Sequence, residues 1–197
     1  MELAQEFYNN NSKEFSDTRY CLWDVVRDFG KQFKKNDFVL DAGCGNGKNI
    51  KYFHEQCNMS GFDTCSNFVK ICKDIGYNVF QSNILNIPME KETLNYIISI
   101  AVIHHLDSEH LHINAINELM RLLKINGQLL VTLWAYESDN YSKKNKFIKG
   151  HNTVLFNTSE RYYYIYDEEM LKNMLGQINY SYRYYWERGN WNIIFTK

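Results

Sequence analysis

The sequence predicts an α/β fold in which a mostly parallel sheet is wound in both directions. An apolar stretch at residues 38–40 runs into three glycines at alternate positions, Gly43, Gly45 and Gly47. Further apolar stretches alternate with amphipathic segments, which is the rhythm of parallel strands joined by right-handed helical crossovers. Residues 96–103 are apolar without interruption, as in a strand buried on both faces at the centre of such a sheet.

The composition is that of one globular domain covering residues 1–197. The chain has 197 residues, of which 45% are hydrophobic, and one proline. Its net charge of −1 gives no global basic field for nucleic acid, although local lysine-rich patches remain. No stretch approaches the ~20 apolar residues that cross a bilayer, and the first residues lack a signal-peptide pattern. We therefore expect no membrane partner and a cytoplasmic location, with a nuclear one as the alternative.

The cysteines and histidines follow no metal-binding pattern. Five cysteines occur without a C-x-x-C pair, which is typical of small buried thiols rather than of a disulfide framework or a zinc ribbon. His110 and His112 lie two positions apart on a predicted helix and so face different ways. We expect no bound metal.

The first 35 residues are predicted to form a helical cap over the ligand pocket. Residues 2–12 form a short helix, and apolar residues at helical spacing place a second helix at Trp23–Phe33. Between the helices lie Arg19 and Tyr20, for which two readings stay open: a lid over the pocket, or packing on the surface.

The middle of the chain alternates strictly between strands and helices after the glycine turn. A turn at residues 124–127 leads into the fifth strand. The expected strands are 59–63, 78–81, 96–103 and 128–135, and the expected helices are 49–55, 66–75 and 108–123.

The last third is predicted to close the sheet with an antiparallel hairpin. Residues 136–160 are polar and irregular and are expected to form a long, partly disordered loop. Asp167 begins a helix that runs to residue 175, and Gly176 ends it. Segments 180–187 and 191–196, joined by a short turn, form the hairpin. A seven-stranded, mostly parallel sheet with such a hairpin at its edge is the plan of class I methyltransferases.

The glycine turn predicts a nucleoside cofactor at the carboxyl end of the first strand. A dinucleotide pyrophosphate prefers the spacing G-x-G-x-x-G and no carboxylate nearby. Here the spacing is G-x-G-x-G, and Asp41 precedes it by two residues. An acid at that place suits an ammonium and a sulfonium better than two phosphates. The sequence therefore favours S-adenosylmethionine over NAD, with a structural role for Asp41 as the alternative.

Other cofactor contacts are expected from the ends of neighbouring strands. Asp63 follows the second strand at the distance expected for a carboxylate that binds the ribose, and its alternative role is a turn or helix cap. Asn83 and Ile84 follow the third strand and are placed to meet the adenine, with simple turn formation as the alternative for Asn83. The end of the central strand carries Ala101, which we also assign to the cofactor site.

Two adjacent histidines, His104 and His105, follow that central strand. A histidine there could orient an acceptor group or share a proton. One of the two is expected to be a core histidine bonded to backbone, and we assign the functional role to His105.

The chain resembles the eukaryotic tRNA wobble-uridine carboxymethyl methyltransferases, including the methyltransferase domain of the AlkB-homologue tRNA enzyme. The resemblance runs along nearly the whole chain in the same order. The glycine turn is generic, whereas the other motifs are specific in combination. The motifs are Phe7-Tyr-Asn9, Phe15-Ser-x-Thr-Arg-Tyr-x-x-Trp23, Leu40-Asp-x-Gly-Cys-Gly-Asn-Gly-Lys48, Leu85-Asn-x-Pro88, Ser99-Ile-Ala-Val-Ile-His-His105, Trp134-Ala135, Arg161-Tyr-Tyr163 and Glu187-Arg-x-Asn-Trp191.

The resemblance implies methyl transfer from S-adenosylmethionine to the carboxylate of 5-carboxymethyluridine in a tRNA anticodon loop, giving the methyl ester. It also implies a small zinc-binding activator protein as partner, for which the edge strand at residues 78–81 offers a docking edge. The acceptor site implied by the resemblance consists of Arg19, Tyr20, His105, Arg188, Asn190 and Trp191.

These residue types suit a carboxylate acceptor. A carboxylate with a pKa near 4 is ionised at neutral pH, so it needs a cationic clamp and correct placement rather than a strong base. Tyr20, Trp191 and the pair Tyr162-Tyr163 could stack an unpaired base, or be sheet and core residues. A small-molecule methyltransferase and an inactive binding module are the alternative functions.

The chain departs from the family pattern at three places. The acid usual after the third strand is replaced by Asn83, which puts the cofactor affinity in doubt. The segment 136–160 is shorter than its counterpart, so RNA contacts there are in doubt. Asn192 stands where a second tryptophan is expected.

Overall fold

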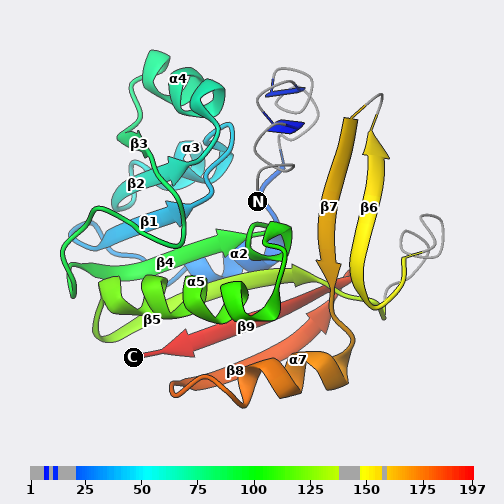
Figure 1. Cartoon of the computed structure of the whole chain (residues 1–197). Helices are drawn as coiled ribbons and strands as arrows, with labels where there is room; N and C mark the ends of the chain where they lie inside the picture. Colours follow the sequence, from blue (N-terminus) through cyan, green and yellow to red (C-terminus); the bar gives the residue numbers. More distant parts are fainter. Residues whose placement is uncertain (1–6, 9–10, 13–20, 138–146, 157–158) are drawn as a thin grey trace.

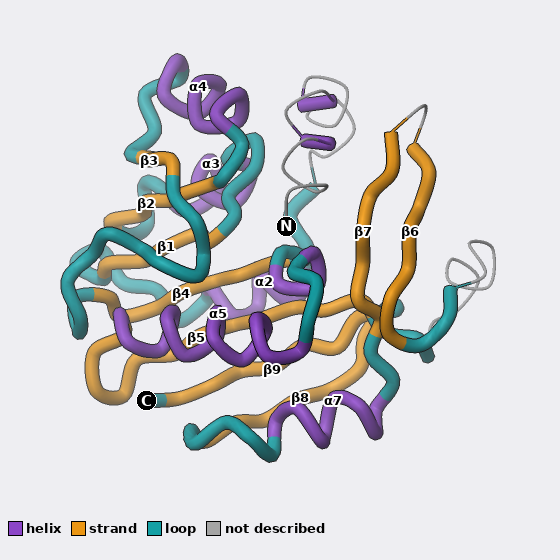
Figure 2. The backbone as a smooth tube through the Cα atoms, viewed as in Figure 1, coloured by secondary structure: helices purple, strands orange, loops and turns teal. Residues whose placement is uncertain are grey.

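The computed structural model describes residues 7–8, 11–12, 21–137, 147–156 and 159–197. It has a seven-stranded sheet flanked by helices, and a separate two-stranded ribbon (Figures 1 and 2). The helices are α2 (Asp24–Gly30), α3 (Lys48–Phe53), α4 (Ser66–Asp74), α5 (Glu109–Leu122) and α7 (Glu168–Leu175). The strands are β1 (Phe38–Ala42), β2 (Asn58–Asp63), β3 (Val79–Gln81), β4 (Leu94–Ile100), β5 (Leu123–Trp134), β6 (Gly150–Phe156), β7 (Ser159–Ile165), β8 (Ser181–Glu187) and β9 (Asn190–Thr196).

The sheet has the strand order β3-β2-β1-β4-β5-β9-β8, in which β9 runs antiparallel to both of its neighbours and the other strands share one direction. The predicted doubly wound sheet with a C-terminal hairpin is therefore confirmed. Because β9 is antiparallel, it begins at the edge of the sheet where the parallel strands end. That edge carries both the glycine turn and the β8–β9 turn.

Two apolar layers cover the two faces of the sheet. One layer contains α5 and α7, whose residues Leu119 and Leu171 are fully buried against the sheet. The other layer contains α2, α3 and α4, with Phe29 and Phe53 among its buried residues. In the part of the chain that the structure describes, no helix is long and apolar enough to cross a membrane.

Three element predictions differ from the structure. The central strand ends at Ile100, and residues 103–105 form a 3₁₀ turn, η1 (Ile103–His105). The strand β5 begins at Leu123, so the predicted turn at 124–127 lies inside its bounds. Within the predicted loop 136–160, residues 150–156 form β6.

The strands β6 and β7 pair in register from Gly150 with Ile165 to Phe156 with Ser159. The resulting ribbon extends away from the main sheet (Figure 1). Its base is joined to the sheet by a bridge between Ala135 and Tyr166 and by the side chain of Asp167, which caps α7 and pairs with Lys149. This ribbon places β7 beside the end of the central strand.

Candidate active site

The glycine turn after β1 forms one wall of the main cleft of the protein. All three glycines have left-handed backbone angles, with φ of 80° at Gly43, 52° at Gly45 and 76° at Gly47. The turn is held because the N–H groups of Gly43 and Cys44 both donate to the Phe62 carbonyl, at 2.9 Å. A Cβ at Gly45 would meet nothing within 4 Å, because this position opens into the cleft. The turn thus has room for a ligand against bare backbone.

Asp63, at the end of β2, lies in the same wall of the cleft. Its carboxylate accepts hydrogen bonds from the Gly45 N–H and the Cys65 N–H, both at 2.9 Å. Burial raises the pKa of Asp63, and these N–H donors offset part of that rise. Asp63 is therefore both a turn residue and a carboxylate on the cleft wall, where the ribose hydroxyls of a nucleoside would be bound.

Asp41 lies behind the turn rather than on the cleft wall. Its side chain is 1% exposed, and Asn49 donates to both of its oxygens at 3.1 and 3.3 Å. Burial raises the pKa of Asp41 to about 7, against the lowering effect of the Asn49 hydrogen bond. Among these residues Asn49 lines the cleft. Asp41 is therefore placed behind Asn49 rather than in the lining of the cleft, because side chains alternate along β1 and this one points into the protein. Its contact with the cofactor stays a prediction.

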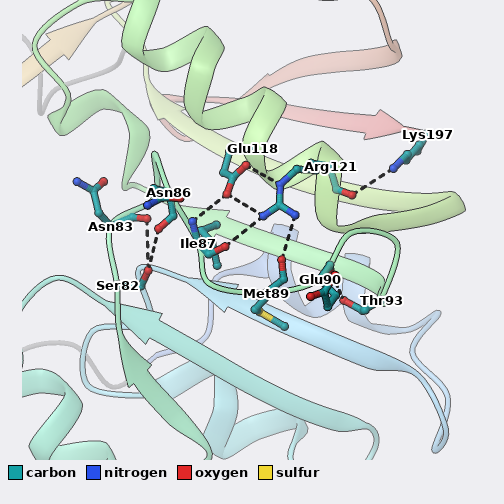
Figure 3. Close-up of polar contacts among 10 residues, drawn as sticks. All are labelled: Ser82, Asn83, Asn86, Ile87, Met89, Glu90, Thr93, Glu118, Arg121 and Lys197. Atoms are coloured by element: carbon teal, nitrogen blue, oxygen red, sulfur yellow. Dashed lines mark hydrogen bonds and ion pairs between the residues drawn. The ribbon is translucent and has the colours of Figure 1, made fainter.

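Asn83 and Ile84 also line the cleft, on the loop 82–89 that follows β3. The Asn83 Oδ1 accepts the Leu85 N–H at 3.0 Å, so the alternative role in turn formation applies to this residue as well. The loop is fixed to α5 by an ion pair: Glu118 accepts the Ile87 N–H at 2.8 Å, and Arg121 donates to the Ile87 and Met89 carbonyls (Figure 3). This network sets the position of the predicted adenine contacts.

Ala101 takes an unusual backbone conformation where the central strand ends. Its φ is +58°, a region that costs an alanine about 1–3 kcal/mol. The Ala101 N–H donates to the backbone oxygen and to the Oγ1 of Thr132 on β5. These bonds hold the strained residue in the lining of the cleft, and its contact with the cofactor stays a prediction.

The two adjacent histidines have different partners. His105 uses both ring nitrogens: Nδ1 donates to the Tyr162 carbonyl at 2.8 Å, and Nε2 accepts from the Tyr8 hydroxyl at 3.0 Å. His104 is fully buried, and its Nδ1 accepts the Trp134 N–H at 3.2 Å, so a neutral ring carries its proton on Nε2. That Nε2 has no hydrogen-bonding partner among the described residues. Burial lowers the pKa of His104 well below its usual value.

The wall opposite the glycine turn is aromatic and carries a buried cation. Arg161 on β7 is 4% exposed, and its guanidinium lies 5.0 Å from the ring centre of Phe7 and 4.8 Å from that of Tyr163. Tyr163 stacks on Trp134 with ring centres 4.3 Å apart. Arg161, Tyr163 and Trp134 all line the cleft with His104. A negatively charged group entering the cleft would therefore meet a guanidinium held between aromatic rings.

The residues predicted for the acceptor site are only partly brought together. Arg19 and Tyr20 lie outside the described residues. Arg188 is exposed and pairs with Asp24 at 2.8 Å, and Asn190 lies beside it, so both sit in a second cleft rather than in the main one. Trp191 is 5% exposed and donates its indole N–H to the Tyr166 carbonyl at 3.1 Å. Trp191 is therefore a core residue, and its predicted contact with the acceptor is wrong.

Sequence reasoning missed two groups on the cleft wall. Tyr8 was inside a motif that carried the resemblance, but its hydroxyl partner His105 is 97 positions away. Arg161 was quoted in a motif too, without a role. Its role depends on the β6–β7 ribbon, which the irregular composition of residues 136–160 concealed. The run of tyrosine and isoleucine at residues 162–166 was the available signal for a strand.

The described part of the cleft fits S-adenosylmethionine. Gly45 leaves open space against the turn, Asp63 presents a carboxylate, and Ile84 presents an apolar surface for a base. In the described ranges no group of three histidine, cysteine, aspartate or glutamate side chains is placed to hold a metal ion.

Comparison with known proteins first identifies the kind of fold. Residues 40–131 match the family described as "Methyltransferase domain". A putative methyltransferase in complex with the Haloferax volcanii Trm112 methyltransferase activator has the same fold, with a TM-score of 0.68 at 10% identity over 97% of this chain and 96% of that one. The chain therefore has the class I methyltransferase fold and contains a match to a methyltransferase domain.

The sequence relatives are named as tRNA methyltransferases. A tRNA (carboxymethyluridine(34)-5-O)-methyltransferase of Schizosaccharomyces pombe is 29% identical over 100% of this chain and 96% of its own length. One of Xenopus tropicalis is 36% identical over 77% of this chain, and this chain spans 24% of that protein. The chain is thus similar to tRNA (carboxymethyluridine(34)-5-O)-methyltransferases, and it spans about a quarter of the length of the Xenopus relative.

Proposed function

We propose that this protein transfers the methyl group of S-adenosylmethionine to a carboxylate oxygen of 5-carboxymethyluridine at the wobble position of tRNA. The observation that carries the proposal is Arg161, a buried guanidinium in the wall that faces the cofactor turn. The names of the relatives describe this reaction for those proteins, and the buried cation gives this chain a group that suits its acceptor.

The proposed reaction requires correct placement of the carboxylate against the methyl group rather than a general base. S-adenosylmethionine supplies an activated methyl group on a sulfonium. A carboxyl group with a pKa near 4 is already ionised at neutral pH, so its oxygen can attack the methyl carbon without losing a proton. The bond from carbon to sulfur breaks as the ester bond forms, and the sulfonium leaves as the neutral thioether S-adenosylhomocysteine. Arg161 would hold the carboxylate by charge-assisted hydrogen bonds, and the methyl ester that forms has lost the negative charge. The product is therefore bound more weakly than the substrate.

The two adjacent histidines have separate roles in this proposal. His105 has both ring nitrogens engaged, so its role is to position β7 and Tyr8 around the cleft. His104 stays neutral because burial lowers its pKa, and its Nε2–H is available as a hydrogen-bond donor next to the aromatic wall. We assign the second donor of the acceptor site to His104, in place of the role that the sequence had suggested for His105.

The partner in this proposal is a small activator protein. β3 is an edge strand of the seven-stranded sheet, and its unpaired side is the docking edge that we assign to the partner. A putative methyltransferase of the same fold is in complex with the Haloferax volcanii Trm112 activator, which supports the choice of partner.

The test is a methyl-transfer assay with labelled S-adenosylmethionine, with and without a candidate activator. One substrate is an anticodon stem-loop that carries 5-carboxymethyluridine, and the control is the same RNA with uridine. We expect base-labile label on the first RNA alone. Equal labelling of both RNAs would exclude the carboxylate acceptor, and transfer to free 5-carboxymethyluridine with the efficiency of the RNA would favour a small-molecule enzyme.

A further inference from the structure

A second cleft lies next to the main one, between the start of α2 and the β8–β9 turn. Trp23 lines both clefts, and Trp134 of the main cleft pairs in register with Asn190 of the second. The two clefts therefore adjoin at the edge of the sheet where the parallel strands end. The lining residues from the turn side are Glu187, Arg188, Asn190 and Asn192.

Asn192 is a buried amide with no hydrogen-bonding partner in the part of the chain that the structure describes. The residue is 1% exposed, and neither its Oδ1 nor its Nδ2 makes a hydrogen bond to any described residue. Leaving a buried polar group unpaired destabilises a folded protein, so an unpaired amide that lines a cleft is a candidate binding group. The position is also one where the family resemblance predicts tryptophan, which would have filled the space with carbon.

The direction of the Asn192 side chain follows from the alternation along β9. Trp191 packs in the layer that contains α5 and α7, whereas Ile194 packs in the layer that contains α2. Successive side chains in a strand point to opposite faces, so Asn190 and Asn192 share the α2 face with Ile194. Two amides thus stand about 7 Å apart along the strand, on the side where the second cleft lies.

Asn190 contributes an acceptor of fixed direction. Its Nδ2 donates to the Arg188 carbonyl at 2.9 Å, in a turn where Arg188 has φ of +47°. The remaining Asn190 Oδ1 is buried and unpaired among the described residues. Since Asn190 offers an oxygen and Asn192 offers both an N–H donor and an oxygen, the pair complements a ligand edge that carries a donor beside an acceptor.

We propose that Asn190 and Asn192 bind the imide edge of a pyrimidine, accepting from its N3–H and donating to a flanking carbonyl. This subsite rests on the proposed function, in which the base of an unpaired wobble uridine must lie beside the carboxylate site. Trp23, between the two clefts, gives that base an aromatic face on which to stack. The second cleft is then where the base is read, and the main cleft is where its carboxylate reacts.

The test compares two anticodon stem-loops that differ by one methyl group. One carries 5-carboxymethyluridine at the wobble position, and the other carries its N3-methyl derivative, which has no N3–H. Binding to the full-length protein is measured by fluorescence anisotropy in the presence of S-adenosylhomocysteine, and methyl transfer is measured separately. We expect the N3-methyl RNA to bind at least about tenfold more weakly. Equal binding of the two RNAs would overturn the proposal.

Asn192→Leu provides the second arm, because leucine keeps the volume and removes the amide. We expect it to weaken binding of the unmodified RNA by about the same factor and to add nothing to the loss caused by N3-methylation. Its melting temperature should be equal to or above that of the wild type, because an unpaired buried amide is removed. Thr196→Val, at the other end of β9, is the control and should bind as the wild type does.

The outcomes separate the two proposals. If the wild type discriminates between the RNAs in binding but transfers no methyl group, the imide subsite stands and the proposed function fails. If the wild type transfers methyl to both RNAs with equal KM, the function stands and the subsite is wrong. An Asn192→Leu variant that binds both RNAs as the wild type does, with an ordered water on Asn192 in the wild-type crystal structure, would also overturn the subsite. If this variant does not fold, the comparison of the two RNAs on the wild type still decides.

Discussion

At the scale of single residues, neighbouring side chains of the same type have different roles. His104 and His105 are adjacent, yet His104 has a buried ring nitrogen that is unpaired among the described residues, and both ring nitrogens of His105 are hydrogen-bonded. Gly43 and Gly45 share a turn, but an added Cβ would strike Val102 at 2.5 Å in the first case and open space in the second. Residue type restricts what a position can do, and its surroundings decide which of those roles it has.

Gly45→Ala should therefore weaken cofactor binding with little loss of stability. The new methyl group would occupy space that faces the ligand, and the left-handed backbone costs about 1 kcal/mol. Gly43→Ala should lose more stability because of the clash with Val102. Calorimetric titration with S-adenosylmethionine and urea unfolding distinguish the two effects. Unchanged affinity in Gly45→Ala would place the cofactor elsewhere.

Arg161→Gln should lower kcat/KM for the carboxylate substrate by about 10–100-fold, which is the range for losing a hydrogen bond to a charged group. Affinity for S-adenosylmethionine should stay within about twofold, because the guanidinium lies in the opposite wall. Arg161→Lys keeps the charge and should recover part of the activity. An Arg161→Gln variant with wild-type turnover would remove this residue from the acceptor site.

At the scale of elements, two segments without an obvious pattern position the site. The ribbon β6–β7 carries Arg161 and Tyr163, and the loop 82–89 carries Asn83 and Ile84. Each is held by a few polar bonds at its base. The ribbon is joined through Lys149 and Asp167, and the loop through Glu118 and Arg121 (Figure 3).

Glu118→Ala should loosen the loop 82–89 and weaken cofactor binding several-fold. The Ile87 N–H loses its acceptor, and Arg121 loses the ion pair that orients it toward the Ile87 and Met89 carbonyls. Hydrogen exchange of residues 82–89 should accelerate. Glu118→Gln keeps an acceptor for Ile87 and is the matched control, with a smaller effect. If exchange in the loop is the same in both variants and in the wild type, the network does not hold the loop.

At the scale of the whole molecule, buried titratable groups connect stability to pH. His112 donates from Nε2 to the Leu106 carbonyl and accepts from the Tyr166 hydroxyl at Nδ1, and burial lowers its pKa to about 4. The unfolded chain takes up a proton near pH 6.5, so the unfolded state binds more protons between these values. Stability is therefore complete above pH 6.5 and falls as the pH drops toward 4.

The contribution of His112 to this loss should be on the order of 3 kcal/mol. Urea unfolding of the wild type and of His112→Gln at a series of pH values isolates it, since the variant lacks the titrating ring. Asp41 has the opposite sign, because burial raises its pKa, but it is present in both proteins and cancels. Parallel stability curves for the two proteins between pH 4 and 6.5 would contradict this assignment.

The fold and the cofactor wall were predictable from the sequence because their signals are local. The glycine turn, Asp63 and the strand ends follow one another along the chain, and β-α alternation brings them to one edge. The acceptor wall could not be derived in this way. Arg161 comes from a ribbon that joins the sheet beyond β5, and Trp191 faces the core because of the register of β9 with β5. A local sequence pattern does not predict the register of two strands or the packing of segments that are far apart in the sequence.

The two walls of the main cleft thus come from different parts of the sequence. Its cofactor wall comes from one continuous stretch, which falls inside the 40–131 match to the methyltransferase domain. The facing wall is collected from Tyr8, Trp23, Trp134 and β7, and the second cleft adds residues of β9. Mutations can accumulate in those outlying pieces while the contiguous part keeps its sequence. Substitutions in these outlying segments can therefore change the acceptor side of the cleft while the wall proposed for the methyl donor stays the same. Position 192 is one place where such a substitution would have this effect.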